Sequence, residues 1–399
     1  MPYYPYLIIG GGMTAASAVH GIRQVDPQGK IGLISAEDHS PYDRPPLTKG
    51  LWKGKPLEEI YRPMDVPNLE MHLGRDVIAL DPAAKKVEDD QHTAYTYGKL
   101  LLATGGSPRQ LPYGGKDILY YRTLDDYKNL HQQTIGKKHF AVIGGGFIGS
   151  EIAAALAMHG QQVTIIFPEP GIGGAIFPAN LSVFLNDYYR SKGIDVLPGE
   201  MVNGLERNED QFVLQTRSGR KLVVDRVIAG IGIQPNTELA EKAGLAVDNG
   251  IVVDEHLRSS QPDIFAAGDV ANFYNSLLDK RLRVEHEDNA NAMGEAAGRN
   301  MALAQPEPYD YLPFFYSDLF ELGYEAIGET SSKLEIAADW QEKFKQGVVY
   351  YLNQGRVRGV LLWNVWKQVD AARQLIGEPG PFNAENLKGR LPEQVGEKK

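Results

Sequence analysis

The chain contains no cysteine among its 399 residues. This absence excludes a disulfide bond, a thiolate metal site and a C-x-x-C redox pair. Any electron transfer must therefore run through a bound group, because the chain offers no thiol that could act as a relay.

Metal-binding patterns, long apolar runs and positive charge are also scarce. The 9 histidines occur in no H-x-x-x-H or H-E-x-x-H spacing, so we expect no metal site. No apolar run reaches the roughly 18 to 20 residues that a membrane helix needs. A formal net charge of -10 argues against general nucleic-acid binding. The first strand-like residues follow the N-terminal methionine almost directly, so we expect no targeting peptide and a cytoplasmic protein.

Glycine, in contrast, is abundant, and one glycine-rich segment organises the middle of the chain. Residues 140–151, FAVIGGGFIGSE, combine an apolar strand, a G-x-G-x-x-G turn and the start of a helix. In this fingerprint Gly144 makes the tight turn, Gly146 lets the backbone approach a pyrophosphate, and Gly149 packs the helix against the strand. The segment therefore predicts a dinucleotide-binding βαβ unit.

The strand that follows this fingerprint ends beside an acid. Residues 162–167 form an apolar run that leads to Glu169, which is placed to bind an adenosine ribose. No arginine follows within the next ten residues, so a 2′-phosphate has no obvious partner and the sequence favours NADH over NADPH. Strands at 194–197, 212–216 and 223–228 complete this middle region.

A second copy of the fingerprint opens the chain. Residues 4–9 read as a strand, and Gly10, Gly12 and Ala15 give the G-x-G-x-x-A variant. A further strand at 30–35 ends near Glu37, which can accept from a ribose hydroxyl. Two copies indicate two nucleotide-binding domains.

Two further segments carry candidate binding residues. The proline-rich loop at 41–50, PYDRPPLTKG, presents Arg44 and Lys49, either against phosphate or a reactive ring or as a solvated basic loop. The apolar strand in DIFAAGD stops at Gly268 and Asp269, an acid that either binds a sugar-like chain or faces solvent in a turn.

The last part of the chain indicates a long helix and then a third domain. Residues 284–304 predict one helix, whose small residues allow close packing and whose N-terminus could favour an anionic ring edge. After a proline-rich break, strands are expected at 314–320, 347–351 and 357–363, with a helix at 369–376.

The order of these motifs resembles that of the flavoprotein pyridine-nucleotide oxidoreductases of the glutathione-reductase superfamily. The resemblance covers nearly the whole chain and is carried by GGGMTA, PYDRPPLTK, LLLATGG, IGGGFIGSE, AGIGIQPN and DIFAAGD. Within its ferredoxin-reductase-like branch, the chain is most similar to apoptosis-inducing factor and its microbial relatives. The segments IIFPEPGIGGAIFPANLS, RVEHEDNANAMGEAAGRNM, YSDLFELGYEAIGE and GVLLWNVWKQVDAARQLI carry this similarity, and dioxygenase-type ferredoxin reductases have Trp in place of His286.

The resemblance implies an α/β fold with two Rossmann-like dinucleotide-binding domains and a smaller α+β C-terminal domain. The FAD-binding domain would comprise residues 1–112 and 244–304, and the NADH-binding domain residues 113–243. Residues 305–382 would form the C-terminal domain, and residues 383–399 a loose tail. Targeting and C-terminal insertions of the animal proteins are not expected, nor is their DNA-binding role in so acidic a chain.

For FAD, the resemblance implies a site on the first fingerprint. Glu37 would bind the ribose. The position at which the family usually has this acid is occupied by Ala36, one residue earlier. Asp269 would hold the ribityl chain, and Lys49 would form an ion pair with Glu151 beside flavin N5. The complete FAD set is Gly10, Gly12, Ala15, Glu37, Arg44, Lys49, Thr104, Gly105, Gly268 and Asp269.

For NADH, the resemblance implies a site on the second fingerprint. Phe147 would cover the nicotinamide until NADH displaces it, Glu285 and His286 would face the nicotinamide pocket, and Trp363 would lie near the isoalloxazine. The remaining residues of this set are Gly144, Gly146, Gly149, Glu169 and Gly232. The expected catalytic residues are Lys49, Glu151, His286 and Trp363.

The leading interpretation is an FAD-dependent NADH oxidoreductase that passes electrons to an external acceptor: a [2Fe–2S] ferredoxin, a quinone, a small oxidant or oxygen. Zero cysteines exclude reductases that act through a protein dithiol. The alternative is a redox-gated interaction protein, in which a long-lived FADH2–NAD charge-transfer complex controls dimerisation or partner binding. A third, weaker interpretation is the reductase component of an oxygenase, and a homodimer is possible in each case.

Overall fold

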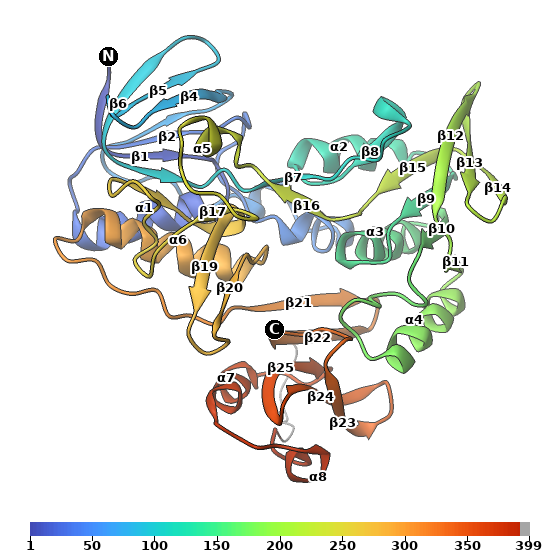
Figure 1. Ribbon diagram of the computed structural model, residues 1–399. Coiled ribbons are helices and arrows are strands. Elements are labelled where there is room, and N and C mark those ends of the chain that lie inside the picture. Colours follow the sequence, from blue (N-terminus) through green and yellow to red (C-terminus); the bar gives the residue numbers. More distant parts are fainter. Residues whose placement is uncertain (392–399) are drawn as a thin grey trace. The chain divides into compact units, whose positions relative to one another are not determined.

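The computed structural model describes residues 1–391 (Figure 1). It contains two compact units, each built from three segments of the chain. Unit 1 comprises Met1–Arg44, Pro56–Ser107 and Gln234–Pro313, and unit 2 comprises Pro45–Lys55, Pro108–Ile233 and the chain from Phe314 onwards. Two short strands, β7 (Gly106–Pro108) and β16 (Ile233–Pro235), lie where the chain passes from one unit to the other. The three-domain division expected from the sequence stays a prediction.

The main sheet of unit 1 has the strand order β3-β2-β1-β6-β5-β4, and β18 also pairs with β6. β1, β2, β3, β6 and β18 are parallel, whereas β4 and β5 extend the sheet as antiparallel strands. β2 and β18 are buried along their whole length, as are residues 7–9 of β1 and 100–102 of β6, which is typical of parallel strands covered on both faces. The strands are β1 (Tyr3–Ile9), β2 (Ile31–Ile34), β3 (Leu69–His72), β4 (Val77–Asp81), β5 (Lys86–Asp89), β6 (Ala94–Leu102) and β18 (Ile264–Ala266).

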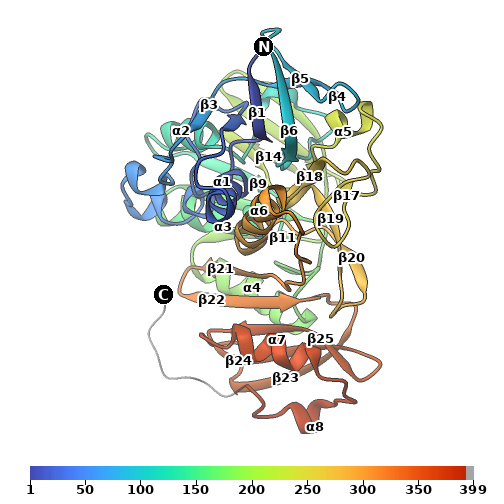
Figure 2. The ribbon, with the colours of Figure 1, turned by 90° about the vertical axis from the view of Figure 1, so that its left-hand side faces the viewer.

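Two long helices of unit 1 pack side by side, α1 (Met13–Val25) and α6 (Glu287–Ala302) (Figure 2). Their backbones are so close that a Cβ on Gly21 would lie 2.1 Å from the carbonyl oxygen of Glu295. The small residues of 284–304 therefore do allow close packing, as expected. The remaining elements of unit 1 are α5 (Glu238–Lys242), β17 (Ile251–Val252), β19 (Ala271–Asn275) and β20 (Lys280–Leu282).

Unit 2 contains a parallel sheet with the strand order β11-β10-β9-β15-β8. The expected strand at 223–228 is instead two strands in different sheets, because Asp225 ends β14 and accepts a hydrogen bond from the backbone N–H of His139 at 2.8 Å. The strands are β8 (Ile118–Tyr120), β9 (His139–Ile143), β10 (Gln162–Phe167), β11 (Ile194–Pro198) and β15 (Arg226–Ala229). A small antiparallel sheet has β12 (Val202–Asn208), β13 (Gln211–Thr216) and β14 (Lys221–Val224), and the helices are α2 (Leu124–Gln133), α3 (Phe147–Met158) and α4 (Ala179–Ser191).

The C-terminal part of unit 2 is an antiparallel sheet with the order β21-β22-β25-β24-β23, and α7 packs on β22 and β25. Within the stretch expected to be a loose tail, residues 384–387 form α8, because Asn383 makes a capping box and Leu387 is buried. No helix in residues 1–391 is long and apolar enough to cross a membrane. The elements are β21 (Phe314–Leu319), β22 (Leu322–Gly328), β23 (Glu335–Glu342), β24 (Gln346–Asn353), β25 (Arg356–Trp363), α7 (Val369–Gly377) and α8 (Ala384–Leu387).

Candidate functional site

The first fingerprint forms the turn between β1 and α1. Gly10 has a φ of 125°, and a Cβ at this position would lie 2.1 Å from the carbonyl oxygen of Ala103, so the turn requires glycine. Gly12 precedes α1 without any side-chain cap, and the first turn of the helix carries no acid. The N-terminal N–H groups of α1 are therefore available to an anion such as a pyrophosphate.

Glu37 and Arg44, both expected at the FAD site, bind each other in unit 1. Arg44 Nη2 lies 2.5 Å from Glu37 Oε1, and the Tyr42 hydroxyl donates to Glu37 Oε2 at 2.5 Å. Arg44 also lies near the first fingerprint, because its Nη2 is 3.9 Å from the position of a Cβ on Gly12. The structure thus brings Glu37 and Arg44 together beside the turn.

Other expected FAD residues lie at the carboxyl ends of β6 and β18. Thr104 donates to the carbonyl oxygen of Asn236 at 2.9 Å, and the backbone of Gly105 accepts from Asn236 N–H at 3.0 Å. Gly268 packs against Thr14, since a Cβ would lie 2.3 Å from Thr14 Oγ1. Asp269 follows directly, with its carbonyl oxygen fixed by Arg283 at 3.0 Å. The carboxyl ends of these parallel strands are the usual place for a ligand in a doubly wound sheet.

Glu285 and His286 precede α6. The helix begins one residue after His286, which occupies its N-cap position, rather than at 284. Glu285 is held by the largely buried guanidinium of Arg283 at 2.7 Å. Burial lowers the pKa of His286 to about 4, although the carboxylate of Asp269 opposes this shift, so the imidazole is neutral near pH 7.

The second fingerprint forms the turn between β9 and α3 in unit 2. Gly144 has a φ of 114°, and a Cβ on Gly149 would lie 1.9 Å from the carbonyl oxygen of Gly144, so both positions require glycine. A Cβ on Gly146 would meet nothing within 4 Å, because it would point into open space. The N-terminus of α3 has no side-chain cap, whereas Thr123 gives α2 a full capping box. The features expected of a pyrophosphate-binding turn are present.

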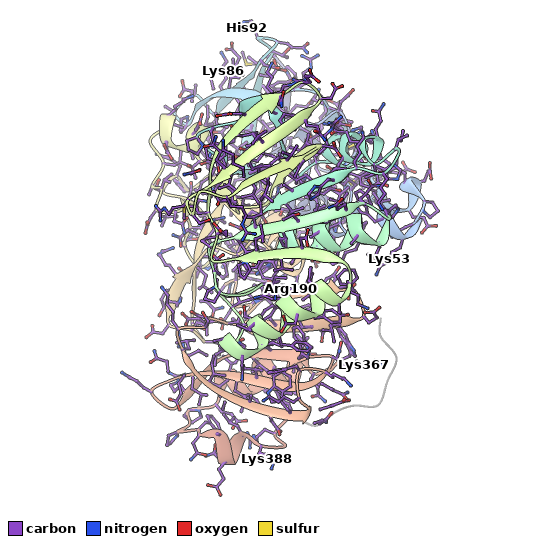
Figure 3. The ribbon with its side chains drawn as sticks, turned by 90° about the vertical axis from the view of Figure 1, so that its right-hand side faces the viewer. Lys53, Lys86, His92, Arg190, Lys367 and Lys388 are labelled. Atoms are coloured by element: carbon purple, nitrogen blue, oxygen red, sulfur yellow. The ribbon has the colours of Figure 1, made fainter. Side chains whose placement is uncertain are left out.

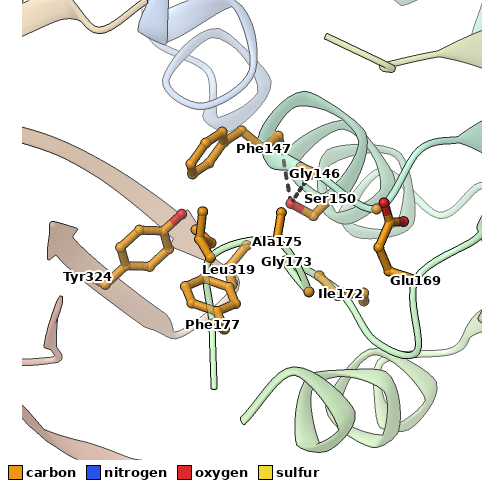
Figure 4. A pocket seen from close by; sticks show the side chains of 13 residues that line it. Gly146, Phe147, Ser150, Glu169, Ile172, Gly173, Ala175, Phe177, Leu319 and Tyr324 are labelled. Atoms are coloured by element: carbon orange, nitrogen blue, oxygen red, sulfur yellow. Dashed lines mark hydrogen bonds between the residues drawn. The ribbon is translucent and has the colours of Figure 1, made fainter. Parts of the chain in front are cut away.

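A pocket of about 90 Å³ opens beside this second turn (Figure 4). In the close-up, the carboxylate of Glu169 lies at one end and the ring of Tyr324 at the other. Phe147 also lines the pocket and packs edge-on against Phe315, with ring centroids 5.1 Å apart. The lining residues are Gly145, Gly146, Phe147, Ser150, Glu169, Ile172, Gly173, Gly174, Ala175, Ile176, Phe177, Leu319 and Tyr324.

Gly232, also expected to bind NADH, lies outside these lining residues. It has a φ of 93°, and its carbonyl oxygen accepts a hydrogen bond from the backbone N–H of Arg109 at 2.9 Å. This glycine shapes the turn that leaves the parallel sheet after β15.

Lys49 and Glu151 form the expected ion pair inside unit 2. Lys49 Nζ lies 2.6 Å from Glu151 Oε1, and Glu151 is 6% exposed. Two hydroxyl groups that the sequence analysis missed complete the cluster. Ser317 donates to Oε1 at 2.5 Å and Thr48 donates to Oε2 at 2.6 Å. Thr48 stands next to Lys49 in the sequence, but nothing local links Ser317 to either residue.

Trp363, expected near the isoalloxazine, is 0% exposed within the C-terminal sheet, and its place beside the flavin stays a prediction. It stacks on Tyr324 at 5.7 Å, and its indole N–H donates to the carbonyl oxygen of Phe344 at 2.9 Å. The exposed ring beside the ion pair is Tyr316, which lies 5.4 Å from Lys49 Nζ.

Comparison with known proteins gives the family. A family model described as pyridine nucleotide-disulphide oxidoreductase matches residues 4–294. The chain belongs to this family. A second model, the C-terminal domain of mitochondrion-associated apoptosis-inducing factor, matches residues 329–378. The α/β fold and the resemblance to this branch, both expected from the sequence, are therefore confirmed.

The relatives include apoptosis-inducing factors and ferredoxin reductases. Mitochondrial apoptosis-inducing factor 1 of Dictyostelium discoideum is 36% identical, with 94% of this chain and 78% of the relative covered. Putidaredoxin reductase CamA of Pseudomonas putida is 33% identical, with 96% and 94% covered. Among solved structures, the covalent putidaredoxin reductase–putidaredoxin complex matches with a TM-score of 0.90 and 31% identity, over 96% of this chain and 95% of that one.

Proteins of this family are oxidoreductases that use FAD and NAD(P)H. The residues of this chain fit both FAD and NAD(P)H. Each fingerprint has an uncapped helix N-terminus and glycines at positions where a side chain would collide with backbone. The second fingerprint adds an open space at Gly146 and a pocket that ends at Glu169. Cofactor binding, predicted from the sequence, is thus confirmed at the level of the family.

Proposed function

We propose that this protein is an NADH oxidoreductase that transfers hydride from NADH to FAD and passes the electrons to an external acceptor. The observation that carries the choice of NADH is the environment of Glu169. Among residues 1–391 its carboxylate has no hydrogen-bond or ion-pair partner, and no Lys or Arg lines the pocket. A carboxylate that keeps its acceptor oxygens can bind the two hydroxyl groups of an adenosine ribose.

NADPH fits this environment poorly. Its 2′-phosphate would place a charge of about −2 beside the carboxylate of Glu169, with no cation among the lining residues to compensate. The phosphate and the Glu169 carboxylate would repel each other, and the apolar lining from Ile172 to Phe177 would supply little screening of their charges.

When bound, FAD supplies the two-electron chemistry, and the protein supplies position and charge. The proposal gives Lys49 a fixed positive charge beside the reacting ring, because Glu151 holds its ammonium group at 2.6 Å in a buried cluster. Phe147 closes the pocket at the fingerprint turn. The neutral imidazole of His286, whose pKa burial lowers to about 4, adds no charge near pH 7.

The assignment of Glu169 is tested with Glu169→Ala. We expect a rise in KM for NADH with little change in kcat, because the ribose contact is lost equally from the ground and transition states. The preference for NADH over NADPH should fall by about tenfold, which corresponds to about 1.4 kcal/mol. Glu206→Ala is the control, since Glu206 is an exposed acid of the same unit outside the pocket. An unchanged preference in Glu169→Ala would contradict the assignment.

For the acceptor, the names of the relatives favour a ferredoxin. They include a 5,5'-dehydrodivanillate O-demethylase ferredoxin reductase subunit, 34% identical, and CamA. Many such acceptors are acidic, and this chain has a net charge of -10, so docking would use local basic side chains. Lys53, Arg190 and Lys388 are exposed on different elements of unit 2 (Figure 3).

The acceptor is tested by adding a [2Fe–2S] ferredoxin to the FAD-loaded protein with NADH and cytochrome c. Cytochrome c reduction that depends on the ferredoxin and falls with salt would support the proposal. Equal rates without ferredoxin, or faster oxidation by a quinone or by oxygen, would assign another acceptor.

The match to apoptosis-inducing factor at residues 329–378, together with the Dictyostelium relative, favours a second candidate. In it, reduction by NADH serves to change the conformation and thereby dimerisation or partner binding. Sedimentation velocity with and without NADH separates the two. A reduced state that persists in air and a changed sedimentation coefficient would favour this second candidate.

A further inference from the structure

One wall of the nucleotide pocket is a loop between β10 and α4, residues 171–177, here called the pocket loop. The residues from Ile172 to Phe177 all line the pocket. The start of the loop is fixed by its own domain. Gly173 N–H donates to the carbonyl oxygen of Gly145 in the fingerprint turn at 2.8 Å, and Ser182 donates to that of Ile172 at 2.7 Å.

The end of the pocket loop is fixed by the C-terminal sheet instead. The hydroxyl of Tyr351, on β24, donates to the carbonyl oxygen of Ile176 at 2.8 Å. The backbone N–H of Ser332 donates to the carbonyl oxygen of Ala175 at 3.0 Å. Tyr351 is 0% exposed, so water cannot readily replace its hydroxyl as the partner of Ile176.

Aromatic packing holds the last residue of the loop. Phe177 is 2% exposed and meets the rings of Tyr324 and Trp363 edge-on, at 5.2 Å and 5.5 Å. Tyr324 and Trp363 are themselves stacked, with an interplanar angle of 7°. Trp363 therefore supports the pocket loop from within the C-terminal sheet.

From these contacts we infer that Tyr351 is a positioning residue for dinucleotide binding, and that the C-terminal sheet sets the affinity of the pocket. This inference rests on the proposed function, which places NADH in the pocket. The pocket loop contributes glycines and apolar side chains, so it binds well only if it is already ordered. The Tyr351 hydroxyl orders its end without touching the ligand.

The test compares two adjacent tyrosines of β24 in the FAD-loaded protein. Tyr351→Phe removes the hydroxyl that binds Ile176. Tyr350→Phe is the matched control, because Tyr350 is equally buried, at 1% exposure, but points to the opposite face of the sheet. Isothermal titration gives the Kd for NAD⁺, and steady-state kinetics with NADH give KM and kcat separately.

We expect Tyr351→Phe to raise the Kd for NAD⁺ and the KM for NADH by about fivefold, with kcat within about twofold of wild type. Tyr350→Phe should leave the Kd unchanged. A merely structural role of Tyr351 would instead lower the melting temperature and leave the Kd of the folded protein unaltered.

Four results would overturn the inference. An unchanged Kd in Tyr351→Phe, or an equal rise in Tyr350→Phe, would overturn it and leave the proposed function standing. Failure of the wild-type protein to bind NAD⁺ would overturn both. If Tyr351→Phe does not fold, Phe177→Leu removes the aromatic contact at the same end of the loop. A normal Kd in that variant would also overturn the inference.

Discussion

The buried Glu151 cluster supports a prediction in which two hydroxyl groups have different effects on stability. Glu151 Oε1 accepts from both Lys49 and Ser317, whereas Thr48 is the donor to Oε2 among residues 1–391. Removal of the Thr48 hydroxyl group therefore leaves Glu151 Oε2, a buried carboxylate oxygen, without this donor. Removal of Ser317 leaves Oε1 with its ammonium partner.

The size of each effect follows from burial. A hydrogen bond to a charged group contributes about 1.5–3 kcal/mol, and an unsatisfied buried acceptor costs most. Glu151 is 6% exposed, and Thr48 and Ser317 are 7% and 1% exposed, so water cannot easily enter. We expect Thr48→Val to lower the free energy of unfolding by about 3 kcal/mol and Ser317→Ala by about 1.5 kcal/mol.

Urea unfolding of the FAD-loaded protein measures both values. The control is Thr164→Val, because Thr164 is 1% exposed and its hydroxyl lies 2.8 Å from His139 Nε2 rather than from a carboxylate. That variant should lose only about 1 kcal/mol. Wild-type stability in both Thr48→Val and Ser317→Ala would refute the reasoning, and a larger loss in Ser317→Ala would refute the assignment of donors to oxygens.

Two further predictions concern acid stability and the fingerprint glycines. Burial lowers the pKa of His286 to about 4 against 6.5 in the unfolded chain, so the unfolded state binds more protons between these values. The free energy of unfolding should therefore reach its full value above pH 6.5 and fall by about 3 kcal/mol towards pH 4. Urea titrations at several pH values should show that the free energy of unfolding depends less on pH in His286→Gln than in the wild type. An identical pH dependence in the two proteins would contradict this explanation. Gly149→Ala should destabilise the protein by about 3 kcal/mol, because its Cβ would lie 1.9 Å from the carbonyl oxygen of Gly144. Gly146→Ala should keep the melting temperature and weaken NAD⁺ binding, since that Cβ meets nothing within 4 Å; equal melting temperatures in the two variants would contradict the geometry.

The sequence predicted those parts of the site in which local spacing determines geometry. A fingerprint fixes the distance between its strand, turn and helix, and both βαβ units lie where the spacing placed them. The Lys49–Glu151 pair was predicted only through the family resemblance, and the structure brings the two side chains together.

The remaining contacts join residues that are far apart in sequence. Ser317 on β21 reaches Glu151 on α3, and Tyr351 reaches the pocket loop from the C-terminal sheet, so no periodicity or spacing could reveal either contact. The placement of Trp363 near the isoalloxazine stays a prediction. An apolar strand end predicts burial, but not which aromatic ring remains exposed beside Lys49, and that ring is Tyr316.

An anaerobic titration of the FAD-loaded protein with NADH tests the central claim most directly. The visible absorbance of the bound FAD should bleach completely after about one equivalent of NADH, because one hydride carries two electrons. NADPH at the same concentration should bleach it far more slowly, since Glu169 repels the 2′-phosphate. An oxidised spectrum that persists in excess NADH would contradict the proposed transfer of hydride from NADH to FAD.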